Sequence, residues 1–185
     1  MKRRKFIIDG GKVFLSSFYI PNFVSANPQN IGVEIEQITF GLDHHFFGYI
    51  GQSLTIPWNK KGNCLVSLSS SFHDHLPGKG EVANVNLINL ERRTKGRYLV
   101  EKLDESQGWN LQQGTMLYWN PQQPDHQFFF NDRNPKSGVI FTVLYDIYKR
   151  QRLKTFHFGH CSFGNSGVCP LGKYFLAINY ARMAR

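Results

Sequence analysis

Three stretches of similar pattern decide the fold: Thr55-Ile-Pro-Trp-Asn-Lys-Lys-Gly-Asn-Cys-Leu-Val-Ser67, Leu117-Tyr-Trp-Asn-Pro-Gln-Gln-Pro-Asp-His-Gln-Phe-Phe-Phe130 and Gly167-Val-Cys-Pro-Leu-Gly-Lys-Tyr-Phe-Leu-Ala-Ile178. Each consists of a short apolar segment, a turn rich in Pro, Asn or Gly, and a second apolar segment. This order is typical of two strands joined by a turn. The sequence therefore predicts an all-β protein in which a hairpin recurs.

Strand patterns also fill the chain between these units, and no segment shows a sustained helical period. The first two units are each followed by a longer strand pair, which gives four strands per unit at a spacing of roughly fifty to sixty residues. The predicted strands are 33–40, 64–68, 82–90, 97–102, 116–119, 127–130, 139–147, 154–158 and 174–178.

A four-stranded sheet cannot bury both faces by itself, so the repeat favours sheets stacked around an axis. We expect a β-propeller with blades at about residues 40–103 and 109–158 and a third blade that begins within 160–185. A propeller has about four to eight blades. The prediction therefore implies missing C-terminal blades, or a partner that covers an open edge. A β-sandwich is the alternative fold.

Composition and charge limit the functional classes. Among 185 residues, 41% are hydrophobic and 15% aromatic, which suits strands, and no apolar run is long enough for an ordinary membrane span. The net charge of +9 includes five basic side chains within residues 1–26. The other basic residues occur in short pairs such as Arg92-Arg93 and form no stripe, which argues against a nucleic-acid partner.

The N-terminal segment predicts export. Arg3-Arg-Lys-Phe-Ile7 resembles a twin-arginine signal, and Val24-Ser-Ala26 would serve as its cleavage site. We therefore expect residues 1–26 to be a signal, residues 27–185 to be the mature domain, and the protein to be periplasmic or extracellular. The alternative is a basic tail that leads into a buried apolar segment.

The three cysteines indicate no thiol chemistry. Cys64 and Cys169 have strand-like apolar neighbours and are expected to be small buried side chains. A disulfide between Cys161 and Cys169 is compatible with an oxidising compartment.

Several motifs resemble those of exported bacterial β-propellers of the TolB-like and oligogalacturonate lyase-like group. His44-His-Phe-Phe-Gly-Tyr49 resembles a blade opening, Trp109-Asn-Leu-Gln-Gln-Gly114 the second blade, and Cys169-Pro-Leu-Gly-Lys173 the Ser-Pro-Asp-Gly-Lys turn. The resemblance covers about residues 40–185 and implies the N-terminal part of a six- to seven-bladed ring. The metal ligands of those lyases have no matched residues in this chain, so the resemblance implies fold more than activity.

A cluster of polar residues is a candidate metal site. His73, Asp74 and His75 could converge on a divalent metal, with a further ligand from His44 or His45. The alternative is a solvated loop, because the neighbouring Pro77-Gly78 is typical of an exposed turn.

Other residues are candidates for ligand binding at a channel face, although each has a structural alternative. Imidazole and aromatic side chains suit a sugar platform, neighbouring amides could pair with hydroxyl or carboxylate oxygens, and a guanidinium could clamp an anion. The alternatives are core packing, capping of strand ends and pairing with Asp132. The candidates are His44, His45, Tyr49, Gln112, Gln113 and Arg133.

Two functions therefore follow from the sequence. The first is an exported propeller that binds a polysaccharide or another ligand at its channel face. The second is a metal-assisted polysaccharide lyase, in which His73, His75 and Arg133 would be the catalytic candidates, because β-elimination needs a base and a cation. Metal dependence distinguishes the two functions.

Overall fold

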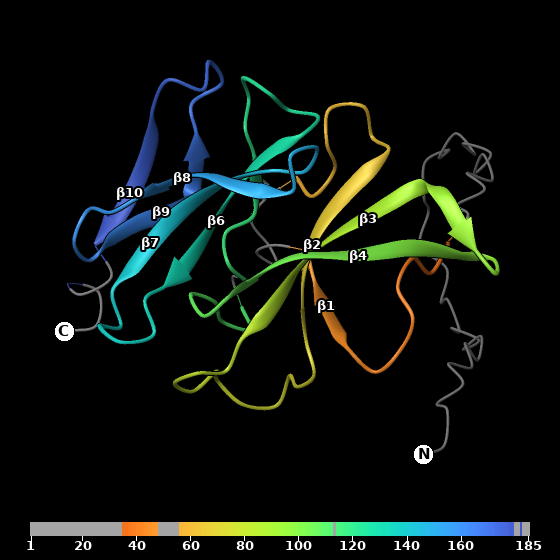
Figure 1. Ribbon diagram of the computed structural model, residues 1–185, viewed down its shortest axis with the longest axis horizontal. Helices are drawn as coiled ribbons and strands as arrows, with labels where there is room; N and C mark the ends of the chain where they lie inside the picture. The colour runs from red at the N-terminus through yellow and green to blue at the C-terminus, as the bar shows by residue number, and fades with distance from the viewer. Residues whose placement is uncertain (1–34, 48–55, 113, 180–181, 183–185) are drawn as a thin grey trace, which may run out of the picture. The chain divides into compact units, whose positions relative to one another are not determined.

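The computed structural model describes residues 35–47, 56–112, 114–179 and 182. Contacts divide the chain into two units, Met1–Ile35 and Glu36–Arg185, and the second unit consists of antiparallel β-sheets (Figure 1). The expected signal segment, residues 1–26, lies outside the described residues. Within the described part of the chain, no helix has the length and apolar character needed to cross a membrane.

The described residues of this unit form two four-stranded sheets and one two-stranded sheet, and every pairing among them joins strands that are consecutive in the chain. Sheet 1 contains β1 (His44–Phe46), β2 (Cys64–Ser70), β3 (Ala83–Thr94) and β4 (Arg97–Ser106). Sheet 2 contains β5 (Tyr118–Trp119), β6 (Gln127–Arg133), β7 (Ile140–Asp146) and β8 (Gln151–Phe156), and sheet 3 contains β9 (Cys161–Val168) and β10 (Phe175–Asn179). The all-β prediction is therefore confirmed. Open antiparallel sheets of this kind occur in both propellers and sandwiches.

The three recurring units are hairpins in the structure. In each turn, one side chain near its start accepts hydrogen bonds from backbone N–H groups of the same turn. The Asn59 side-chain oxygen accepts the backbone N–H groups of Asn63 and Cys64, both at 3.0 Å. Asn120 accepts the N–H of Gln122 at 3.1 Å. The Cys169 sulfur accepts two N–H groups, from Lys173 and Tyr174, at 3.3 Å each.

Alternating side chains of β6 connect the three sheets. Phe128 and Phe130 are fully buried in a core shared with Val66, Leu68 and Val85 of sheet 1. Phe129 lies on the opposite face of sheet 2, in a second core with Val168 of β9 and Phe175 of β10. Because successive strand residues point to opposite faces, one strand packs on both neighbouring sheets.

Polar contacts hold the same sheets together at the C-terminal end of β6. The side-chain oxygen of Asn131 accepts hydrogen bonds from Thr142 of β7, at 3.1 Å, and from Ser162 of β9, at 2.6 Å. The linker from sheet 1 runs against β6 so closely that a Cβ atom on Gly108 would lie 2.8 Å from the carbonyl carbon of Asp132. These contacts therefore hold the C-terminal end of β6 in place beside the loops around it.

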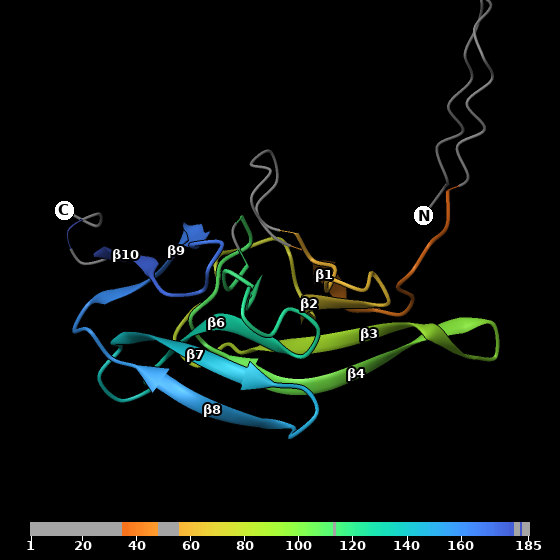
Figure 2. The same ribbon diagram turned by 90° about the horizontal axis from the view of Figure 1, so that it is seen from above.

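The β3–β4 hairpin extends beyond the strand beside it (Figure 2). The pairing of β3 with β2 ends at Asn89, whereas β3 continues to Thr94. Residues 91–97 are all exposed, including Arg92, Lys95 and Arg97.

Two local expectations are wrong. Residues 36–40 form no strand, and Glu36 instead contacts Arg93 and Tyr98 through its side chain. Cys161 and Cys169 are both free, since they lie at opposite ends of β9, roughly 25 Å apart for an extended strand.

Candidate functional site

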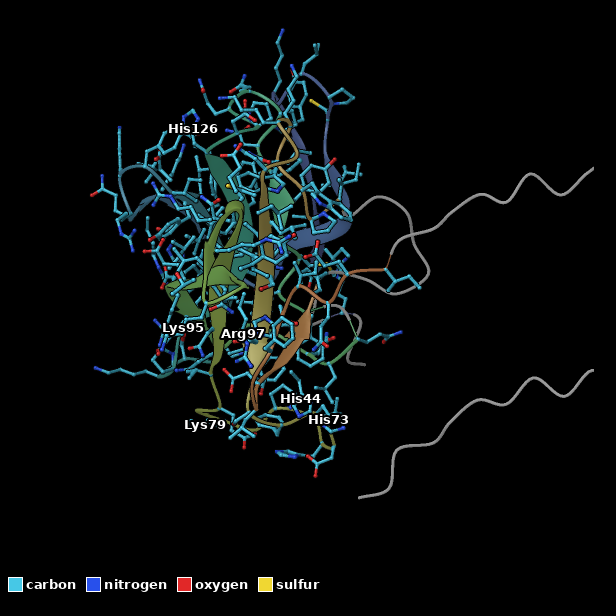
Figure 3. The ribbon with its side chains drawn as sticks, turned by 90° about the vertical axis from the view of Figure 1, so that its right-hand side faces the viewer. His44, His73, Lys79, Lys95, Arg97 and His126 are labelled. Carbon is cyan, nitrogen blue, oxygen red and sulfur yellow. The ribbon has the colours of Figure 1, made fainter. Side chains whose placement is uncertain are left out.

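Five of the candidate residues lie at one end of sheets 1 and 2: His44, His73, Asp74, His75 and Arg133. Strand β2 ends at Ser70 and β6 at Arg133, and the loops that follow them, residues 71–82 and 134–139, lie at this end. His44 begins β1 opposite Ser70, which places it at the same end. Figure 3 shows His44, His73 and Lys79 together there, with His126 at the opposite end. We call this region the loop end.

A basic cleft of about 320 Å³ lies between the two loops. Lys79 comes from the first loop, Lys136 from the second, and Arg133 from the last position of β6. Gln107 of the inter-sheet linker and Ser137 add polar side chains to the lining. The cleft therefore presents three cations and uncharged hydrogen-bonding groups to one small volume.

Arg133 is the central cation of this end. It lines the basic cleft and also two adjoining cavities of about 290 and 140 Å³. Its neighbour Asp132, the partner expected for it, is instead bound by Arg152 at 2.8 Å. Among the described residues, the Arg133 guanidinium has no carboxylate partner. An unpaired guanidinium of this kind can bind a carboxylate, sulfate or phosphate with two hydrogen bonds.

The four histidine and acidic candidates of the loop end, His44, His73, Asp74 and His75, form two separate groups of contacts. Nδ1 of His73 lies 3.0 Å from Nε2 of His44. His75 contacts Asp74 at 2.8 Å and Glu81 at 3.3 Å. The structure therefore does not bring His73, Asp74 and His75 together as one metal site. Within the described chain, no group of three or more His, Cys, Asp or Glu side chains is arranged to hold a metal ion.

The carboxylates beside His75 raise its pKa. Its hydrogen bond to Asp74, followed by that to Glu81, raises the pKa of His75 above the ordinary value of 6.5. The same hydrogen bond lowers the pKa of Asp74. His75 is consequently closer to an imidazolium at neutral pH than an isolated histidine would be.

The remaining candidates occupy different positions. His45 lies on the other face of β1, where its Nδ1 is 3.2 Å from the Ser67 hydroxyl and burial lowers its pKa, partly opposed by the charge of Asp43. Gln112 is exposed on the linker between the sheets. Tyr49 and Gln113 lie outside the described residues. His45 and Gln112 are therefore not part of the basic cleft.

Sequence reasoning missed Lys79, Gln107 and Lys136, which line the cleft with Arg133. They lie on three segments without a common motif, so only the folded chain brings them together. Their positions directly after or between predicted strands were the available signal, since binding residues concentrate on loops.

A separate cavity lies at the opposite end of the strands. It has a volume of about 360 Å³ and is lined by Trp58, Tyr118, Trp119, Pro121 and Pro124, among others. The indole N–H of Trp119 donates to the carbonyl of Pro57 at 2.9 Å. This aromatic cavity is therefore formed by the β1–β2 and β5–β6 turns where they touch.

Comparisons with family models, with curated proteins and with solved structures find no match for this chain.

Proposed function

We propose that this protein is an exported β-propeller that binds an anionic oligosaccharide in the basic cleft. The observation that carries the proposal is Arg133, a guanidinium without a carboxylate partner in the described chain, which lines three adjoining cavities. Lys79 and Lys136 add positive charge from both sides. A sugar acid offers a carboxylate for the guanidinium and hydroxyl groups for Gln107 and Ser137.

The sheet order supports the propeller part of the proposal. Each four-stranded sheet is an antiparallel meander, and the sheets pack face to face through β6. In such a stack the loops after the second strand of neighbouring sheets meet at one end, which is where the cleft lies. The paired arginines and the cleavage pattern within residues 1–26 support export.

Substitution of Arg133 tests the proposal. Arg133→Gln should weaken binding of an oligogalacturonide by about 10- to 100-fold, because a charge-assisted hydrogen bond contributes about 1.5–3 kcal/mol. Calorimetric titration at two salt concentrations measures the effect, and the remaining binding should depend less on salt. Lys95→Gln, which removes an exposed cation from the β3–β4 hairpin, is the matched control.

Each result has a clear meaning. Loss of affinity in Arg133→Gln with unchanged affinity in the control would support the cleft as the binding site. Equal losses in both variants would show only a general effect of charge, and an absence of binding by the unmodified protein would refute the proposal.

Polysaccharide lyase activity is the second candidate, favoured by the imidazoles of His73 and His75 at the same end as Arg133. A β-elimination needs a base that removes the proton beside the uronate carboxylate and a cation that stabilises the enolate. Lyase activity would create an unsaturated sugar that absorbs ultraviolet light and would require a divalent metal. Binding without this product, with and without a chelator, would favour the non-catalytic function.

A further inference from the structure

The contact between His44 and His73 is unusual because it joins two imidazole nitrogens directly. Nε2 of His44 and Nδ1 of His73 are 3.0 Å apart, and the ring centroids are 3.9 Å apart. Two neutral rings can share one proton in this arrangement. The separation also suits a shared cation, since a metal held at about 2.0–2.1 Å from each nitrogen fits a nitrogen separation near 3 Å.

Both rings are held in place by their neighbours along the chain. Phe46, two residues after His44, packs on Trp109 with ring centroids 6.2 Å apart. Phe72, directly before His73, packs on the same indole at 5.4 Å. Trp109 is itself fixed, because its N–H donates to the carbonyl of Glu81 at 3.1 Å. One buried indole therefore positions the strand start and the loop that carry the two histidines.

We propose that His44 and His73 bind a late first-row transition-metal dication, such as Zn²⁺ or Cu²⁺. Imidazole nitrogen is a preferred ligand of these ions, whereas Ca²⁺ and Mg²⁺ require oxygen ligands. His44 is half-buried on β1 and His73 is exposed on the loop, so solvent can reach the pair. Two protein ligands leave the remaining coordination positions open for water or for an anionic ligand, unlike a closed structural site with four protein ligands.

This site differs from the one expected from the sequence. His75 follows His73 by two residues, but its ring stacks on Phe72 with centroids 4.1 Å apart and its nitrogens contact Asp74 and Glu81. Both ring nitrogens of His75 are therefore engaged, whereas the nitrogens of His44 and His73 face each other. The second ligand comes from β1, which is distant in the sequence.

Titration of the chelator-treated full chain with Cu²⁺ and with Zn²⁺ tests the proposal. The thiols are alkylated beforehand, so that Cys161 and Cys169 do not bind the metal. We expect one ion per chain by calorimetry, and a Cu²⁺ paramagnetic resonance spectrum with coupling to two imidazole nitrogens. His73→Gln and His44→Gln should each weaken binding at least about tenfold, whereas His75→Gln, the matched control in the same loop, should leave it unchanged.

His73 is exposed, so His73→Gln is expected to fold normally, and circular dichroism checks this for both variants. The proposal would be overturned if the unmodified chain bound neither ion. It would equally be overturned if His75→Gln abolished binding while His73→Gln retained it. Arg133→Gln should bind the metal normally, because the imidazole pair does not depend on the basic cleft; metal binding can therefore succeed or fail independently of anion binding.

Discussion

At the scale of single residues, the two histidines at the start of β1 have different environments although they are adjacent in the chain. His44 lies at the solvent-accessible end beside His73, and His45 lies on the opposite face beside the Ser67 hydroxyl. Strand geometry accounts for this, because consecutive side chains point to opposite faces. The side chains of His44 and His45 therefore lie on opposite faces of β1, and of the two only His44 lies at the loop end.

His45 should make folding stability depend on pH. Burial lowers the pKa of His45 below its ordinary value of 6.5, and Asp43 opposes this only in part. Between the pKa of His45 in the folded chain and its pKa in the unfolded chain, the unfolded chain therefore binds more protons than the folded chain. The contribution of neutral His45 to folding stability is complete above pH 6.5 and is lost as the pH falls through the folded pKa.

Replacement by glutamine should remove this effect. In urea unfolding between about pH 5 and 7, the stability of His45→Gln should fall less with decreasing pH than that of the unmodified protein. His75→Gln is the control with the opposite sign, because the raised pKa of His75 contributes stability at low pH that is lost as the pH rises through its folded pKa. Parallel curves for His45→Gln and the unmodified protein would contradict the prediction.

At the scale of strands and sheets, Arg152 of β8 joins sheet 2 to sheet 1. It binds Asp104 of β4 at 2.7 Å and Asp132 of β6 at 2.8 Å. The hydrogen bond to Asp104 raises the pKa of Arg152, and burial opposes this increase. Both carboxylates are mostly buried, with 17% and 12% of their side-chain surface exposed, so they depend on this one guanidinium for neutralisation.

Arg152→Met should therefore destabilise the fold. We expect a loss of about 2 kcal/mol in the free energy of unfolding, below the range for a fully buried pair because the Arg152 side chain remains 33% exposed. Arg150→Met, which breaks an exposed pair with Glu101, should destabilise the fold much less, because solvent screens an exposed ion pair. Chemical denaturation measures both changes, and equal losses would show that the link between the sheets contributes nothing beyond a surface ion pair.

Elements were more predictable from the sequence than their contacts. The turns at Asn59, Asn120 and Cys169 were recognisable because Pro, Asn and Gly act locally on the backbone. Residues 33–40 alternate like a strand, but a strand also needs a partner ladder, which residues 36–40 do not find. The basic cleft also depends on contacts between distant segments and was therefore not predictable. Lys79 and Lys136 meet only after the two sheets have packed.

At the scale of the whole sheet stack, the first two residues of β10 have different surroundings. Phe175 faces sheet 2, as Phe128 faces sheet 1. Leu176 of β10 is 64% exposed on the opposite face, and Tyr174 and Leu171, which precede the strand, are 76% and 69% exposed. In a propeller, a further sheet or a partner would cover this face of β10. In a sandwich, this face would be an outer face of the protein.

If this face is built to be covered, the 185-residue chain should associate through it. Leu176→Lys places a charge on the exposed apolar face, so it should reduce both self-association in analytical ultracentrifugation and binding of a hydrophobic dye. Tyr148→Lys is the matched control, because Tyr148 is 69% exposed on a turn after β7 and stacks only on His126 among the described rings. A monomeric chain with weak dye binding in all three proteins would show that the stack can end at sheet 3, as a sandwich does. Selective loss in Leu176→Lys would instead favour a propeller in which another sheet packs on β10.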